Sequence, residues 1–165
     1  MFSSDIKFYE LNYSEDFQIT ENFSIRELYF ATKLTSDEYI TLSEIPLHRN
    51  AILIAQYLRD QLDKPINIGS AYRSPLYEAS KNRSPDGSHA QALAIDLNSK
   101  DPKDLINLVE TAFNNKNHIY NNLRSYGVTS FGFYDWGIHL DFRQRKNDNS
   151  DRFWDDRTDQ VKKKV

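Results

Sequence analysis

Two histidines and one aspartate stand in short motifs whose chemistry suits a metal ion. His89 and Asp96 lie seven residues apart in SHAQALAID, and His139 lies in the later motif GIHLD. A carboxylate within an apolar strand is costly to bury unless it is paired or binds a metal. Two imidazoles and one carboxylate form the ligand set of a catalytic zinc site, in which a fourth position stays open. We therefore predict that His89, Asp96 and His139 bind Zn²⁺.

Arg73 is the candidate for binding a substrate. It lies in the motif SAYRSP, at the end of a short strand expected over residues 65–70. A planar guanidinium suits bidentate capture of a carboxylate, and a fixed donor stabilises negative charge that develops in a water-poor site. The alternative is an arginine that bridges carbonyl groups of the loop.

Two carboxylates near His139 are candidates for a general base. Asp141 follows His139 by two residues, so both side chains lie on one face of a strand. Asp141 could act as the base or could orient a ligand imidazole. Asp135 lies at an expected hairpin turn, where an aspartate can also serve only to form the turn. The sequence does not decide between these roles.

The motifs SAYRSP, SHAQALAID and IHLD resemble the D-alanyl-D-alanine carboxypeptidase and L,D-endopeptidase group of zinc peptidases. Hedgehog signalling domains and vancomycin-resistance dipeptidases are distant relatives of this group. The similarity spans residues 23–143. It implies a zinc peptidase that cleaves peptidoglycan stem peptides, with Arg73 holding the substrate near the scissile bond. The alternative function is a non-catalytic, zinc-stabilised binding or structural module, for example in a phage particle.

The chain departs from the pattern of that group at three positions. Trp136 stands three residues before His139, where the group often has Glu or Asp. Ala92 replaces a glycine, which matters if the backbone there must adopt a positive φ. Leu76 replaces the asparagine that commonly follows YRSP. The changes at Trp136 and Ala92 favour the binding module, whereas Arg73 and the complete ligand set favour the enzyme.

The periodicity of apolar residues predicts an α+β fold, and the resemblance implies a hedgehog-like one, with a small antiparallel sheet that carries the ligands and helices packed on one side. Helices are expected over residues 46–63, from the capping box at Ser24, and after Asp101. Residues 128–134 and 137–142 are predicted to form a hairpin. Residues 74–88 are rich in Ser, Pro, Asn and Gly and are predicted to be a long loop.

The length of 165 residues suits one domain. We expect an N-terminal arm over residues 1–22, the peptidase-like domain over residues 23–145, and a charged tail over residues 146–165 that Phe153 and Trp154 could pin. A net charge of -3 argues against a general nucleic-acid binder, and the absence of cysteine excludes disulfides and thiolate ligands. No apolar run is long enough for a membrane span.

The N-terminal residues carry acidic side chains early and lack the apolar region of a secretory signal peptide. For a protein that acts on the cell wall, this composition favours release by lysis or transport within a particle. We therefore expect a phage lysis protein, an endolysin, or a virion-associated protein.

Overall fold

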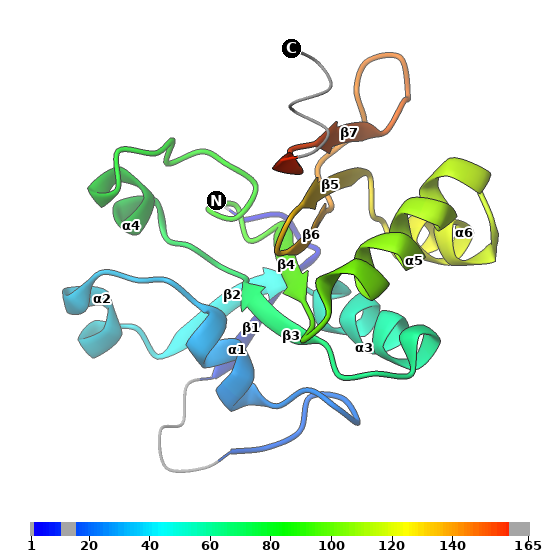
Figure 1. Ribbon diagram of the computed structural model, residues 1–165. Coiled ribbons are helices and arrows are strands. Elements are labelled where there is room, and N and C mark those ends of the chain that lie inside the picture. Colours follow the sequence, from blue (N-terminus) through cyan, green and yellow to red (C-terminus); the bar gives the residue numbers. More distant parts are fainter. Residues whose placement is uncertain (1, 11–15, 159–165) are drawn as a thin grey trace.

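The computed structural model describes residues 2–10 and 16–158 and has an α+β architecture, as predicted (Figure 1). Its helices are α1 (Ile25–Ala31), α2 (Ser36–Thr41), α3 (Ala51–Leu62), α4 (Pro75–Ser80), α5 (Pro102–Asn115) and α6 (His118–Ser125). Its strands are β1 (Ile6–Glu10), β2 (Glu44–His48), β3 (Asn67–Ser70), β4 (Ala94–Asn98), β5 (Ser130–Tyr134), β6 (Gly137–Asp141) and β7 (Arg152–Asp155). In the described part of the chain, no helix is long and apolar enough to cross a membrane.

The five-stranded sheet has the order β3-β4-β6-β5-β7. Its first four strands are antiparallel, which confirms the predicted sheet and hairpin, and β7 joins the edge parallel to β5. A separate two-stranded sheet pairs β1 with β2. Residues 6–10 of the expected arm and residues 152–155 of the expected tail are therefore strands, while residues 159–165 lie outside the described residues.

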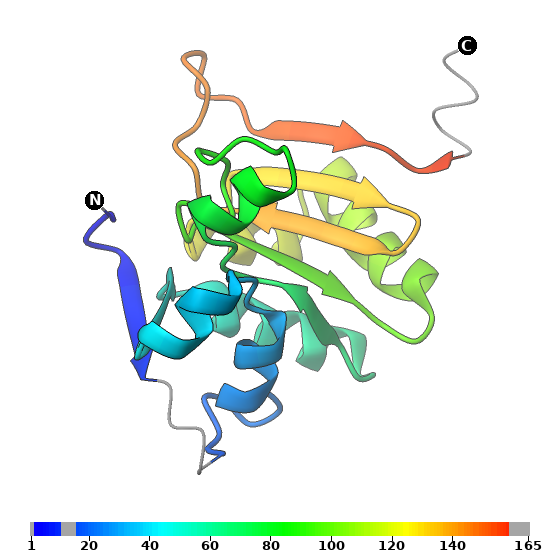
Figure 2. The ribbon, with the colours of Figure 1, turned by 90° about the vertical axis from the view of Figure 1, so that its left-hand side faces the viewer.

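Alternation along the strands divides the large sheet into two faces. One face packs on α3, α5 and α6, as Figure 2 shows from the side, and α4 lies over the other face. The helix-packed face presents side chains that are fully buried in the core: Ile95, Leu97, Phe131, Phe133, Ile138 and Leu140. The residues between them point to the opposite face, because successive side chains of a strand alternate. That second face carries Asp96 and His139.

One predicted helix start was wrong, and one predicted loop contains a helix. The helix expected from residue 46 begins at Ala51, because Pro46 lies in β2 opposite Phe8. A proline is tolerated in such an edge strand, and the partner strand is 38 residues away in sequence. The expected loop over residues 74–88 contains α4, which Ser74 caps and in which Pro75 takes the first position. The predicted capping box of Ser24 with Glu27 is confirmed.

A row of four residues crosses the second face from β4 to β7. Asp96 pairs with His139, His139 with Gly132, and Gly132 with Trp154. The glycine leaves room for the indole, since a Cβ built on Gly132 would overlap the ring of Trp154. The indole ring therefore lies 5.2 Å from the imidazole of His139, measured between ring centroids.

We predict that Gly132→Ala lowers the free energy of unfolding by about 1–3 kcal/mol, because the new methyl group displaces Trp154. The same substitution made together with Trp154→Ala should cost much less, because the overlap is then absent. Denaturant unfolding of the two single variants and the double variant measures this coupling. Additive effects would show that the indole does not depend on the glycine.

Candidate metal centre

Three segments bring the predicted ligands together. Asp96 in β4 lies directly opposite His139 in β6, so the sheet register places both side chains on one face. His89 comes from the segment between α4 and β4. All three side chains are buried. The sequence prediction of a ligand triad agrees with this placement, since the structure brings the three side chains together.

The ligand atoms converge on a single oxygen of Asp96. Nδ1 of His139 lies 2.9 Å from Oδ1 of Asp96, and Nε2 of His89 lies 3.2 Å from the same oxygen. One ligand atom from each residue lies within 4.8 Å of the other two. Two imidazole nitrogens and a carboxylate oxygen at such separations suit one zinc ion with an open fourth position.

The remaining nitrogen of each imidazole is held by a neighbouring oxygen. Nδ1 of His89 donates to the carbonyl oxygen of Ala71 at 2.6 Å, and Nε2 of His139 donates to Oδ2 of Asp141 at 2.8 Å. These contacts fix the ring orientation and leave Nε2 of His89 and Nδ1 of His139 for a metal, as is usual around zinc. The donor set and its supporting contacts therefore fit zinc.

The charges of the cluster depend strongly on one another. Burial opposes ionisation of Asp96, but hydrogen bonds from His139 and His89 outweigh it and hold the pKa of that carboxyl well below its usual range. Burial lowers the pKa of His139, and its contacts with Asp141 and Asp96 more than reverse this, so the pKa is raised. A metal must therefore displace a tightly held proton from His139.

Arg73 is anchored to the same carboxylate. Its Nη2 donates to Oδ2 of Asp96 at 3.0 Å, and its Nε donates to Oγ of Ser70 at 2.8 Å. Its Nη1 lies 3.8 Å from the buried carboxylate of Glu78. Arg73 also lines the hollow of about 290 Å³ above the triad, so its guanidinium faces the space where a substrate would lie.

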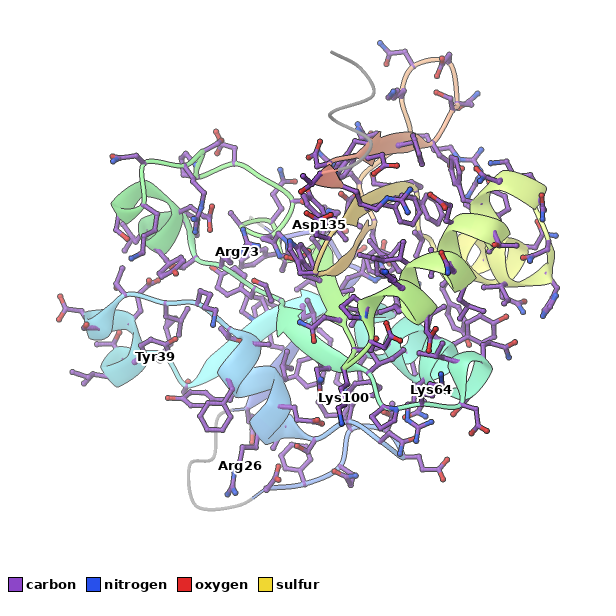
Figure 3. The ribbon with its side chains drawn as sticks, viewed as in Figure 1. Arg26, Tyr39, Lys64, Arg73, Lys100 and Asp135 are labelled. Carbon is purple, nitrogen blue, oxygen red and sulfur yellow. The ribbon has the colours of Figure 1, made fainter. Side chains whose placement is uncertain are left out.

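The two candidate bases have different surroundings. Asp141 is fully buried behind His139, and its carboxylate also binds the guanidinium of Arg143. This geometry suits the orienting role that the sequence had left open. Asp135 lies at the turn between β5 and β6 (Figure 3), where its carboxylate accepts hydrogen bonds from Thr158. Neither residue lines the hollow at the triad.

The hollow has an aromatic wall that the sequence analysis did not assign to the site. Tyr134 stacks on Trp136 with ring centroids 4.8 Å apart, and its hydroxyl accepts a hydrogen bond from Nε1 of Trp154 at 2.7 Å. Arg143 lies on the rim as well. The two-residue spacing of Asp141 and Arg143 could have indicated that Arg143 lies near the site, whereas no local sequence pattern places Trp154 there.

Ala92 adopts the positive φ that the sequence comparison had flagged. Its φ is 61°, and its side chain is fully buried in a small cluster with Ile6, Leu34, Ile45 and Tyr72. The left-handed conformation costs an alanine roughly 1–2 kcal/mol, and burial of one methyl group returns about 0.8 kcal/mol. The packing therefore offsets much of the strain.

The family assignment agrees with this geometry. A model of the family described as peptidase M15 matches residues 21–141, which is most of the chain. The chain belongs to the peptidase M15 family. Peptidases of this family depend on zinc, which matches the donor set found here. No curated protein and no solved structure matched the chain.

We predict that His89→Ala and His139→Ala each abolish zinc binding, because each removes one of three ligands. Metal analysis of the purified wild-type protein should give close to one zinc per chain, and both variants should have a lower Tm. His118→Ala is the matched control, since His118 is exposed in α6. Full zinc content in both ligand variants would disprove the triad.

Zinc affinity should also decrease as the pH falls. The raised pKa of His139 means that protons compete with the metal at this nitrogen over a wider pH range than at an ordinary histidine. Titrations of the metal-free protein with zinc at several pH values measure this effect. A pH-independent affinity between pH 5 and 8 would contradict it.

Proposed function

We propose that the protein is a zinc peptidase that cleaves peptidoglycan stem peptides, as a carboxypeptidase or an endopeptidase. The observation that carries the proposal is the convergence of two imidazole nitrogens and the Arg73 guanidinium on the carboxylate of Asp96, beneath one open hollow. Membership of the peptidase M15 family supports the reaction class. The stem peptide as substrate rests on the resemblance of the motifs to peptidoglycan-cleaving relatives.

Each residue of the site has a distinct task in this proposal. Zinc, when bound, supplies a Lewis acid that polarises the scissile carbonyl and lowers the pKa of water. His89, Asp96 and His139 would hold it, while Asp141 keeps the imidazole of His139 in the orientation that ligation would need. Arg73 presents a fixed donor to a substrate carboxylate or to the negative charge that develops on the carbonyl oxygen.

The general base is assigned to Asp135 in this proposal. Asp141 is enclosed by His139 and Arg143, whereas Asp135 is exposed and lies between two residues that line the hollow, Tyr134 and Trp136. Its carboxylate must leave Thr158 to accept a proton at the metal centre. Catalytic hydrogen bonds often form only when the substrate is bound, so the contact with Thr158 does not preclude this role.

A zinc-stabilised binding module is the alternative function. Among the described residues that line the hollow, Asp96 is the sole carboxylate, and Trp136 stands where relatives often have the base. Such a module would bind wall fragments in the hollow without cleaving them. The further proposal, that the protein acts on the cell wall as a phage lysis or virion-associated protein, rests on the resemblance alone.

Digestion of purified peptidoglycan tests the proposal directly. We expect the zinc-loaded protein to release peptide fragments or free D-alanine, a chelator to stop the release, and added zinc to restore it. Mass spectrometry of the products identifies the bond that is cut. Binding of zinc and wall fragments without any cleavage would establish the binding module instead.

Arg73→Lys should reduce turnover by roughly 10–1000-fold, because the lysine keeps the charge but loses the planar fork. Steady-state rates on a stem peptide, together with zinc content and Tm, separate loss of catalysis from loss of structure. Arg26→Lys provides a control for the substitution on the exposed surface of α1, which lies away from Arg73 in Figure 3. An unchanged rate would return Arg73 to a structural role.

Asp135→Asn and Asp141→Asn should have different effects. Asp135→Asn should abolish cleavage while zinc stays bound, because only the proton acceptor is lost. Asp141→Asn should weaken zinc binding by roughly 10–100-fold, because the support of His139 is weakened, and excess zinc should restore part of the activity. Normal cleavage by the Asp135 variant would place the base elsewhere in the chain.

A further inference from the structure

A second hollow lies next to the metal centre, and half of its lining residues are basic. It has a volume of about 620 Å³, and Arg143 lines both hollows. Most of its wall comes from the connection between β6 and β7, which lies beside the segment after α4 in Figure 2. We call it the basic groove; its lining residues are Gln91, Leu93, Arg143, Gln144, Arg145, Lys146, Asn147 and Arg152.

The positive charge of the basic groove is only partly neutralised. Four of its lining residues are cations and none is an acid, in a chain whose net charge is -3. Two acids near it already bind other groups. Asp141 binds His139 as well as Arg143, and Asp151 accepts hydrogen bonds from Tyr120 and Arg124 while lying 3.7 Å from Arg145.

The two remaining cations, Lys146 and Arg152, are more available to bind a ligand. Lys146 is exposed and forms no ion pair within 4.0 Å among the described residues; the exposed carboxylate of Asp148, in the same loop, accepts hydrogen bonds from Ser150. Arg152 donates one N–H to the carbonyl oxygen of Gln144, which uses a neutral acceptor and leaves its charge unpaired in the described residues. Lys146 interacts electrostatically with Asp148 but forms no close ion pair with it, so a carboxylate in the groove would meet two cations, Lys146 and Arg152, that form no ion pair within 4.0 Å in the described part of the chain.

Arg143 connects this charge to the metal centre. Its Nε and Nη2 bind Asp141, which itself holds His139, so the guanidinium has a fixed position between the two hollows. An extended peptide advances about 3.3 Å per residue, and Arg143 lines the same hollow as the triad, so a chain bound there can reach Arg143 within a few residues. The residues from 143 to 152 lie beyond the range of the family match, so the groove is a feature that the match does not account for.

We propose that the basic groove binds a carboxylate of the substrate at a residue away from the bond that is cut. The proposal rests on the proposed function, because it assumes that a peptide lies across the triad. A peptide carboxylate is favoured over a separate anionic polymer, since Arg143 lines both the groove and the hollow at the triad and the two are therefore adjacent. Stem peptides are rich in free carboxylates and therefore offer such a group.

Two synthetic stem peptides that differ only at this carboxylate, free in one and amidated in the other, test the proposal. Binding to the zinc-loaded full-length chain is followed by tryptophan fluorescence in the first milliseconds after mixing, because Trp136 and Trp154 both line the hollow at the triad. We expect the free carboxylate to bind about 3–10-fold more tightly, a preference that decreases with added salt.

The variants locate the source of this preference. Lys146→Gln with Arg152→Gln should remove it and leave the affinity for the amidated peptide unchanged. Lys146→Gln alone should reduce the preference, which keeps the test valid if the double variant does not fold. Lys100→Gln is the control, because Lys100 is exposed beyond the end of β4, well away from Arg73 in Figure 3.

Equal affinities of the wild-type protein for the two peptides, or failure to bind either, would overturn the proposal. Binding of a glycerol-phosphate oligomer is measured in the same way. If only this polymer binds, and Lys146→Gln lowers its affinity, the groove is a phosphate site and the proposal is wrong. A carboxylate preference without any cleavage would refute the peptidase and keep the groove. Cleavage of both peptides with equal KM and Kd would keep the peptidase and refute the carboxylate site in the groove.

Discussion

The buried carboxylate of Asp96 is the group on which the arrangement of the site depends. Burial of a charge is costly unless partners surround it, and Asp96 has three: two imidazoles at Oδ1 and the guanidinium of Arg73 at Oδ2. These partners come from β6, from the segment after α4, and from the segment after β3. The electrostatic requirement of one aspartate thus joins three parts of the chain that are far apart in sequence.

The sheet separates this charge cluster from the apolar core, although charged and apolar residues are neighbours in the sequence of β4. Ile95 and Leu97 are fully buried against the helices, while Asp96 between them points to the opposite face. Alternation therefore lets the same strand supply both the core and a metal ligand. Gly132 extends the pattern, because the absence of its side chain lets Trp154 approach His139 and close one wall of the hollow.

The local chemistry of the sequence was enough to predict the α+β class, the hairpin and the three side chains that the structure brings together at the candidate metal centre, because each depends on residue types within short segments. The start of α3 was wrong because Pro46 suits both a first helical turn and an edge strand, and β1, far away in the chain, decides between them. The role of Asp141 stayed open because a spacing of two residues fixes the face of the strand but not the depth of burial. Trp154 was expected only to pin the tail, and its place at the hollow was not predicted because it depends on the return of β7 to the sheet.

The cost of the charged cluster itself argues for metal chemistry. Replacing a buried ion cluster by apolar residues of similar volume is often neutral or stabilising, so stability alone does not require Asp96, Asp141 and the two imidazoles at these positions. A zinc ion would offer these groups a common partner: Nε2 of His89, Nδ1 of His139 and Oδ1 of Asp96 would hold it, while Ala71 and Asp141 would still hold the far sides of the rings. Arg73 then remains bound to the other oxygen of Asp96, so the group that steadies the ligand is the same group that faces the substrate.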